Sequence, residues 1–307
     1  MMEDAESQVT INFTSPPSSE EHAAVERSIE TLRQRAYHRN SVRRATDEAL
    51  AAVTPLPPER KRIEIAEDDP AAIAAAEAVT REQREFLSAM TLDPSRLASG
   101  EGVAFEGAAA VAGVADEVFA IPYHYDWRWH VGDSQPDSAA DLSTGEIRVG
   151  VASIFSLRRC DAHAGFGVGV RADHDHWVTA RSLRRSWEQC RVWSGATGAV
   201  SLAEGGMEMT VLEGGNLLDL EQDKRFRIRL NPGFWSAPED GAYDSGGFGT
   251  GASIELRWFM QAGHTYQVNV GAWVLAEWTS GPHAAGPIAS ASGSVVAKAL
   301  AITLFHD

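Results

Sequence analysis

Cysteine, positive charge and long apolar runs are all scarce in this sequence, and each shortage excludes a class of protein. Two cysteines among 307 residues, Cys160 and Cys190, cannot build a disulfide framework, and only a single bridge between them stays open. The 43 acidic side chains outnumber the 27 basic ones and give a net charge of −16. A chain this acidic lacks the positive surface that binds nucleic acid or an anionic membrane.

No stretch approaches the roughly 18 apolar residues that a membrane-spanning helix needs. The N-terminus, MMEDAESQVTINFTSPPSSEE, lacks the basic segment and apolar core of a cleaved secretory signal. We therefore expect a soluble protein without a membrane span, either cytoplasmic or exported without a cleaved signal peptide.

Catalytic signatures are missing as well. The sequence has no Gly-x-Ser-x-Gly elbow of a hydrolase, and the glycine-rich loop 240–251 lacks the Lys-Ser/Thr of a phosphate-binding loop. Acidic residues are too numerous to single out a catalytic carboxylate pair. The sequence thus predicts no catalytic residue, and a non-enzymatic role is favoured over an enzymatic one.

Three regions follow one another along the chain. Residues 1–18 are polar and rich in serine and proline, which predicts a flexible tail. Residues 19–118 are helix-rich, with one helix that stops at the prolines of 55–58 and a second that opens at Asp69-Pro70 and runs to about Met90. The first helix has one apolar stripe, for which packing on a neighbouring element is favoured over a coiled coil; the stripe consists of His22, Val25, Ile29, Leu32 and Ala36.

Residues 119–307 alternate apolar and polar side chains in about eight short runs, without long helices between them. This pattern predicts an antiparallel β-sandwich or jelly roll, with a closed barrel as the alternative. The run 254–260 and the run 266–270 flank Gln261-Ala262-Gly263 and are interpreted as a hairpin. Segment 177–193 is ambiguous between strand and short helix. Alternating glycines in 165–169 indicate a bulge or a close approach of other backbone.

The strongest chemical signal is Asp173-His174-Asp175-His176. In a strand, His174 and His176 project to one face about 6–7 Å apart, close enough to share a metal ion. His163 is the preferred third ligand, and His124 and His130 are alternatives. Solvated histidines at a strand end are the competing interpretation. The His-x-His pair resembles the strand motif of cupins, but Ala180 stands where the cupin glutamate follows, so no family is assigned.

Exposed aromatic side chains would favour a glycan ligand, because sugar rings stack on them. Trp235, Tyr243 and Trp278 lie beside turn residues and are the candidates for such a surface, although core packing explains most of the nine tryptophans. The alternation in 123–131 puts a polar face opposite an aromatic one, and this polar face reads more simply as the solvent side of an edge strand; it comprises His124, Asp126, Arg128 and His130.

Three functional hypotheses result. The first is a non-enzymatic β-sandwich that binds protein partners or self-associates, with its helices mediating oligomerisation or docking. The second is a metal-binding protein or metalloenzyme that uses His174 and His176. The third is a carbohydrate-binding module.

Overall fold

A computed structural model describes residues 9–53, 116–132, 137–153, 159–194, 200–230, 239–245, 249–250, 254–279 and 289–306. Within these ranges the protein is mainly β, every strand pair is antiparallel, and a single helix lies at the N-terminal end. The predicted helix from Asp69 to Met90 lies outside the described residues. The described helix is not long and apolar enough to cross a membrane.

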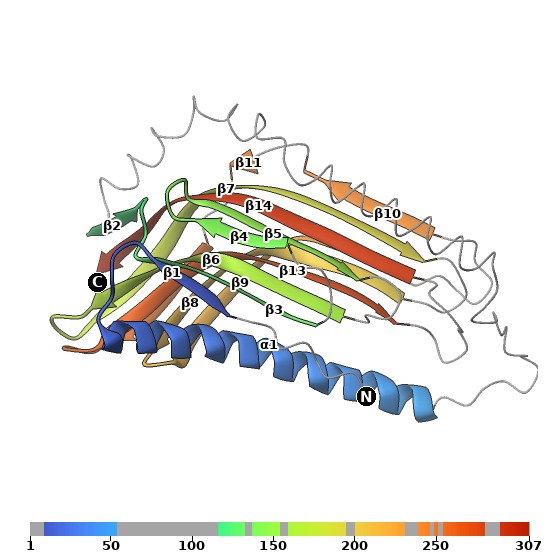
Figure 1. The fold of residues 1–307 in the computed structure, drawn as a ribbon, viewed down its shortest axis with the longest axis horizontal. Coiled ribbons are helices and arrows are strands. Elements are labelled where there is room, and N and C mark those ends of the chain that lie inside the picture. Colours follow the sequence, from blue (N-terminus) through green and yellow to red (C-terminus); the bar gives the residue numbers. More distant parts are fainter. Residues whose placement is uncertain are drawn as a thin grey trace, which may run out of the picture.

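Two sheets lie one over the other, with the helix α1 (Ser19–Val53) along the outer face of the first (Figure 1). Sheet I has the strand order β1 (Thr10–Phe13), β3 (Tyr125–Val131), β6 (Arg159–Arg171), β13 (Thr265–Thr279), β8 (Val200–Glu213) and β9 (Asn216–Leu230). Sheet II has the order β10 (Glu239–Asp244), β7 (His176–Ser194), β14 (Ala289–His306), β5 (Glu146–Ser153) and β4 (Asp137–Asp141). Three short strands complete sheet II: β11 (Gly249–Thr250) and β12 (Ile254–Met260) pair with β7, and β2 (Glu117–Ala120) pairs with β14.

The strand pairs are nested along the chain. β8 pairs with β9, β7 with β12, β6 with β13, and β5 with β14. The inward faces of both sheets contribute to one hydrophobic core, with residues such as Phe166, Val268, Met209, Val149 and Leu256. The alternation in the sequence therefore reflects two sheets that bury their facing sides against each other.

The predicted hairpin at 254–270 is wrong. β12 pairs with β7 in sheet II, whereas β13 pairs with β6 and β8 in sheet I. The turn at 261–264 carries the chain from one sheet to the other, so that the apolar faces of both strands point into the same core. Alternation and a turn residue alone cannot distinguish this arrangement from a hairpin, because both bury the same side chains.

Helix α1 begins where the sequence predicts it. Ser18 and Glu21 form a reciprocal capping box, with the Glu21 amide donating to Ser18 Oγ (3.2 Å) and the Ser18 amide donating to the Glu21 carboxylate (2.8 Å). These bonds lower the pKa of Glu21. Apart from the exposed His22, the apolar stripe is buried against an aromatic face of β3. This cluster contains Val25, Ile29, Leu32, Ala36, Tyr125, Trp127, Trp129 and Val131. The stripe thus packs against sheet I of the same chain, as expected for packing on a neighbouring element.

The alternating glycines of β6 make room for these aromatic rings. A Cβ on Gly167 would lie 2.2 Å from Cζ of Tyr125, and a Cβ on Gly165 would lie 2.7 Å from Cζ2 of Trp127. Any side chain there would displace the aromatic layer beneath α1. The partners that approach these glycines therefore include side chains of the next strand, which the sequence pattern did not indicate.

Four further segments of uncertain or different expectation are placed by the structure. Thr10–Phe13 forms β1 beside β3, within the region expected to be a flexible tail, because Ile11 and Phe13 pack against the helix cluster. Segment 177–193, ambiguous in sequence, belongs to the long strand β7, and the start of the glycine-rich loop 240–251 belongs to β10. The polar face of β3 is not a solvent face throughout, since Asp126 is 6% exposed and accepts a hydrogen bond from Asn12 Nδ2 (2.8 Å).

Candidate functional site

The Asp-His-Asp-His motif lies where the chain passes from sheet I to sheet II. Residues 172–175 connect β6 to β7 and turn sharply, and the β12–β13 turn packs beside them. The Gly263 amide donates to the Ala172 carbonyl (2.8 Å), and the Ala262 amide donates to Asp175 Oδ1 (2.7 Å). Asp175 therefore anchors the neighbouring turn, while Asp173 is left at the outside of the bend.

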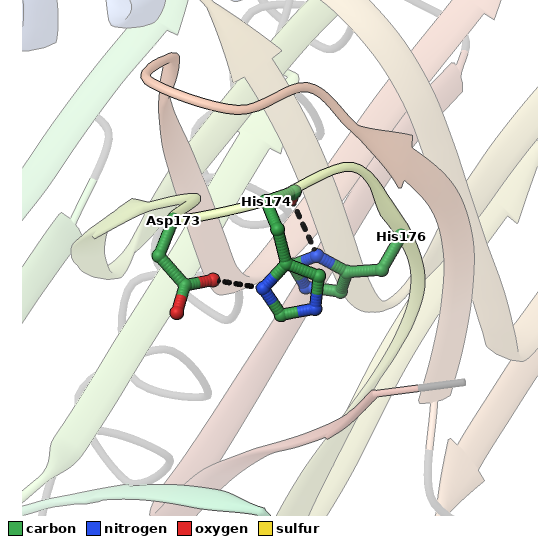
Figure 2. Close-up of side chains that lie close together, drawn as sticks. All are labelled: Asp173, His174 and His176. Atoms are coloured by element: carbon green, nitrogen blue, oxygen red, sulfur yellow. Dashed lines mark hydrogen bonds and ion pairs between the residues drawn. The ribbon is translucent and has the colours of Figure 1, made fainter.

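The bend brings three potential metal ligands together (Figure 2). Asp173, His174 and His176 each offer one ligand atom, and these atoms all lie within 4.8 Å of one another. Asp173 Oδ1 contacts His174 Nδ1, and both side chains are exposed to solvent. This contact lowers the pKa of Asp173. The structure thus joins Asp173 to the two histidines that the sequence singles out.

His176 is the buried member of the group, with 6% of its surface exposed. Its Nδ1 lies 2.8 Å from the backbone carbonyl of His174. A carbonyl oxygen only accepts, so Nδ1 carries the proton, and Nε2 of the neutral ring presents a lone pair. That Nε2 is buried and has no hydrogen-bond partner in the described structure. An orphaned nitrogen in a ring oriented through Nδ1–H is the typical state of a metal-ligating histidine.

A third imidazole lies next to His176 and was missed from the sequence. The ring centroids of His176 and His306 are 4.7 Å apart, and those of His174 and His176 are 4.4 Å apart. His306 ends β14, where it pairs in register with Val178 of β7. No local sequence pattern predicts this neighbour, because 130 positions separate His306 from His176. The two residues come together only through the pairing of β7 with β14.

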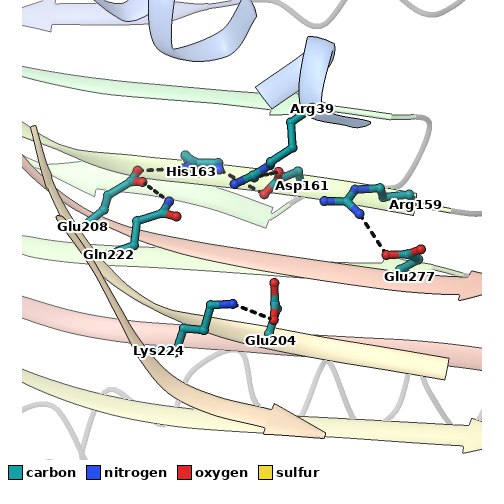
Figure 3. Close-up of polar contacts among 9 residues, drawn as sticks. All are labelled: Arg39, Arg159, Asp161, His163, Glu204, Glu208, Gln222, Lys224 and Glu277. Carbon is teal, nitrogen blue, oxygen red and sulfur yellow. Dashed lines mark hydrogen bonds and ion pairs between the residues drawn. The ribbon is translucent and has the colours of Figure 1, made fainter. Parts of the chain in front are cut away.

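His163, the expected third ligand, lies elsewhere. It is on the face of β6 that points toward α1, eight residues before the end of that strand and roughly 26 Å from the turn at ~3.3 Å per residue. Figure 3 shows it between two carboxylates, with Nε2 3.0 Å from Asp161 Oδ1 and Nδ1 2.6 Å from Glu208 Oε1. Both ring nitrogens are therefore occupied.

The alternative third ligands also lie apart from the motif. Both are in or beside β3 of sheet I, and burial lowers the pKa of each. His124 Nδ1 accepts a hydrogen bond from the Gly169 amide (3.0 Å). Among the described residues, neither His124 nor His130 joins the group of Asp173, His174 and His176.

The expected aromatic surface is not assembled within the described residues. Trp235 lies outside them, and Trp278 is placed only by its backbone, opposite Ser201 in sheet I. Tyr243, on β10, is partly buried and its ring stacks on Phe226 at 6.1 Å. Instead, Trp177 and Phe259 are exposed side by side on sheet II, at 47% and 41%.

The two cysteines are both buried thiols. Cys160 belongs to β6 of sheet I and Cys190 to β7 of sheet II. Burial raises the pKa of the Cys190 thiol to about 12, which keeps it protonated and unreactive. They do not form the disulfide bridge that the sequence left open.

No protein-family model and no curated protein sequence matches this chain. Solved structures give faint similarities. The enzymatically active domain of tailspike protein 4 from bacteriophage CBA120 is 10% identical with a TM-score of 0.20, over 59% of this chain and 19% of that one. A CBM4 structure is 10% identical with a TM-score of 0.18, over 64% of this chain and 97% of that one. Infectious bursal disease virus, strain Gt, is 11% identical with a TM-score of 0.12, over 63% and 43%. Scores at this level assign neither fold nor function, so the residues themselves must carry the functional argument.

Proposed function

We propose that this protein is a metal-binding protein whose ion is held by Asp173, His174 and His176. The observation that carries the proposal is the buried Nε2 of His176, which has no hydrogen-bond partner and belongs to a ring whose Nδ1 is already fixed by a carbonyl. Burying an imidazole nitrogen without a partner costs free energy, and a bound cation would offset that cost.

The ligand types favour a borderline transition metal such as Zn²⁺. Imidazole nitrogens bind zinc, copper and nickel well, whereas Ca²⁺ and Mg²⁺ prefer sites built from oxygen ligands alone. Ligand atoms around tetrahedral zinc lie about 3.4 Å apart, given bonds of about 2.0–2.1 Å. The exposed side chains of Asp173 and His174 have room for the rotation that this contraction requires.

We also infer that the two sheets form a β-sandwich of the jelly-roll type. The nested pairs β5–β14, β6–β13, β7–β12 and β8–β9 support this assignment. So does their distribution, since β5, β14, β7 and β12 share one sheet and β6, β13, β8 and β9 share the other. A jelly roll of this kind divides eight strands between two sheets in this way.

The metal proposal is tested by titrating the chelator-treated full chain with Zn²⁺ in a calorimeter. We expect one ion per chain, no change in His22→Ala, and an affinity at least about 100-fold weaker in His176→Ala and in His176→Gln. His22 is the control because it is exposed on α1 and does not belong to the group of Asp173, His174 and His176. Circular dichroism melting of each variant separates a lost ligand from a lost fold. Failure of the wild type to bind, or equal binding by folded His176 variants, would overturn the proposal.

A role in assembly or protein binding, the first hypothesis from the sequence, is a proposal separate from the metal site. It gains no support from the apolar stripe of α1, because Val25, Ile29 and Leu32 already pack on sheet I. Deleting residues 1–53 would expose the aromatic face of β3 and could itself cause association. The oligomeric state should therefore be measured by light scattering on the full chain. If the protein were monomeric at every concentration, the hypothesis of self-association would be wrong.

The exposed pair on sheet II favours glycan binding as a second candidate. Trp177 and Phe259 present aromatic surface. Four residues further along the same two strands, Arg181 and Glu255 form an ion pair able to exchange hydrogen bonds with hydroxyl groups. A glycan array probed with wild type, Trp177→Ala and Phe259→Ala tests it. Silence of the wild type on every sugar would end this candidate.

A further inference from the structure

We infer that His306, the last described residue of β14, is a fourth ligand that turns the three-ligand group into a closed structural metal centre. The inference rests on the proposed function and adds a residue that belongs to a different part of the chain. It also decides the character of the site, since three protein ligands leave a position open for water or substrate, whereas four close the coordination sphere.

The first support is a second orphaned nitrogen. His306 Nε2 is buried and has no hydrogen-bond partner in the described structure. The group of opposite charge beside it is the Glu117 carboxylate, whose Oε1 lies 3.6 Å away, beyond hydrogen-bond distance. The buried His176 and the partly exposed His306 each leave a buried Nε2 without a hydrogen-bond partner. A movement of the His306 ring toward the group of Asp173, His174 and His176 would let one cation satisfy both nitrogens.

The second support is that the backbone of His306 is held in place. Its amide donates to Asp116 Oδ2 (2.6 Å), and the Asp116 amide donates to the carbonyl of Leu304 (2.9 Å). The strand pairs with β7 up to Val178, two residues from His176. Two ligands are thus fixed on neighbouring strands of sheet II, while Asp173 and His174 come from the adjustable turn.

The arrangement has a mechanical consequence. The turn at 172–175 is the passage between the two sheets, and β14 is a central strand of sheet II that also carries β2. An ion bound by the turn and by His306 clamps the passage to the end of the last strand. Metal binding then stabilises the fold by mass action, and removal of the metal loosens this end of the molecule first.

The test uses Zn²⁺ affinity, the visible spectrum of the Co²⁺ form, and the melting temperature with and without Zn²⁺. We expect wild type to show the strong visible bands of four-coordinate Co²⁺ and a melting temperature raised by added Zn²⁺. His306→Gln should still bind one ion, about 10–100-fold more weakly, with weakened bands and a smaller thermal shift. His264→Gln is the matched control, because His264 is exposed in the neighbouring turn and pairs with Glu213.

The outcomes separate the two proposals. If wild type binds no ion, the metal function itself fails. If wild type binds and His306→Gln matches it in affinity, spectrum and thermal shift, the fourth ligand is wrong while the three-residue site stands. Glu117→Gln tests the neighbouring carboxylate: a loss in that variant with none in His306→Gln would assign the position to Glu117 and overturn the inference.

Discussion

His163 and His176 are both buried histidines, but their surroundings differ in a way that separates structure from function. His163 has a carboxylate on each ring nitrogen and the ring of Trp129 stacked on it at 3.8 Å between centroids. In His176, Nδ1 is hydrogen-bonded to the His174 carbonyl, and Nε2 has no hydrogen-bond partner in the described structure. A buried histidine whose hydrogen bonds are complete needs no further partner, whereas the orphaned nitrogen of His176 requires an explanation, and the proposed metal ion supplies one.

The network around His163 also balances its charge. Arg39 of α1 pairs with Asp161, with Nη2 2.8 Å from Oδ2. Gln222 Nε2 donates a hydrogen bond to Glu208 Oε2 (2.9 Å). Burial by itself lowers the pKa of His163, but the Glu208 and Asp161 carboxylates outweigh it and raise the pKa to about 9. Burial likewise raises the pKa of Asp161, but His163 and Arg39 outweigh it, so the pKa is lowered overall. The helix and sheet I are therefore joined by charges that compensate one another.

The largest effect is expected from Asp161→Asn, which would break this compensation. Asp161 is fully buried, so the change removes one of the two carboxylates that compensate His163 and Arg39 and leaves one positive charge without a counter-charge, at a cost of about 3–5 kcal/mol of unfolding free energy. Urea denaturation measures it. Arg39→Gln is the control and should cost only about 1 kcal/mol, because the Arg39 side chain is 45% exposed. If Asp161→Asn lowered the unfolding free energy by less than about 1 kcal/mol, water would have to reach the network.

A pH series tests the same region with a somewhat smaller effect. Because the folded pKa of His163 is raised to about 9 from an ordinary value of 6.5, its contribution is complete below pH 6.5 and is lost as the pH rises to about 9. The loss is on the order of 3 kcal/mol. Unfolding free energies of wild type and His163→Gln across this range should differ most at low pH and converge at high pH. Parallel curves would contradict the assignment of the charge to His163.

Two glycine substitutions in β6 compare the packing beneath the aromatic layer with the packing nearer the histidine turn. Gly167→Ala should cost about 1–3 kcal/mol, because its Cβ would overlap Tyr125 and the Asn269 amide oxygen at 2.4 Å. Gly169→Ala, two residues nearer the histidine turn, meets nothing closer than His124 Nδ1 at 4.0 Å and should be neutral or slightly stabilising. Thermal melts of both variants measure this contrast. Equal effects would mean that the aromatic layer does not constrain β6.

The smallest effect is expected at the turn itself. His174→Ala in metal-free protein should change the unfolding free energy by less than about 0.5 kcal/mol, because the side chain is exposed to solvent. Chemical denaturation in the presence of a chelator measures this. A cost comparable to that of Asp161→Asn would make the turn a structural network like the one around His163.

Residues a few positions apart were enough to predict the helix at 19–53 and strands beyond residue 119, because capping and periodicity are local. The sequence also singled out His174 and His176, whose spacing is local. Three features needed contacts between distant segments: β12 and β13 belong to different sheets, carboxylates enclose His163, and His306 lies beside His176. Strand partners are chosen by burial and hydrogen bonding across the whole domain, and alternation within one segment says which face is buried but not against what.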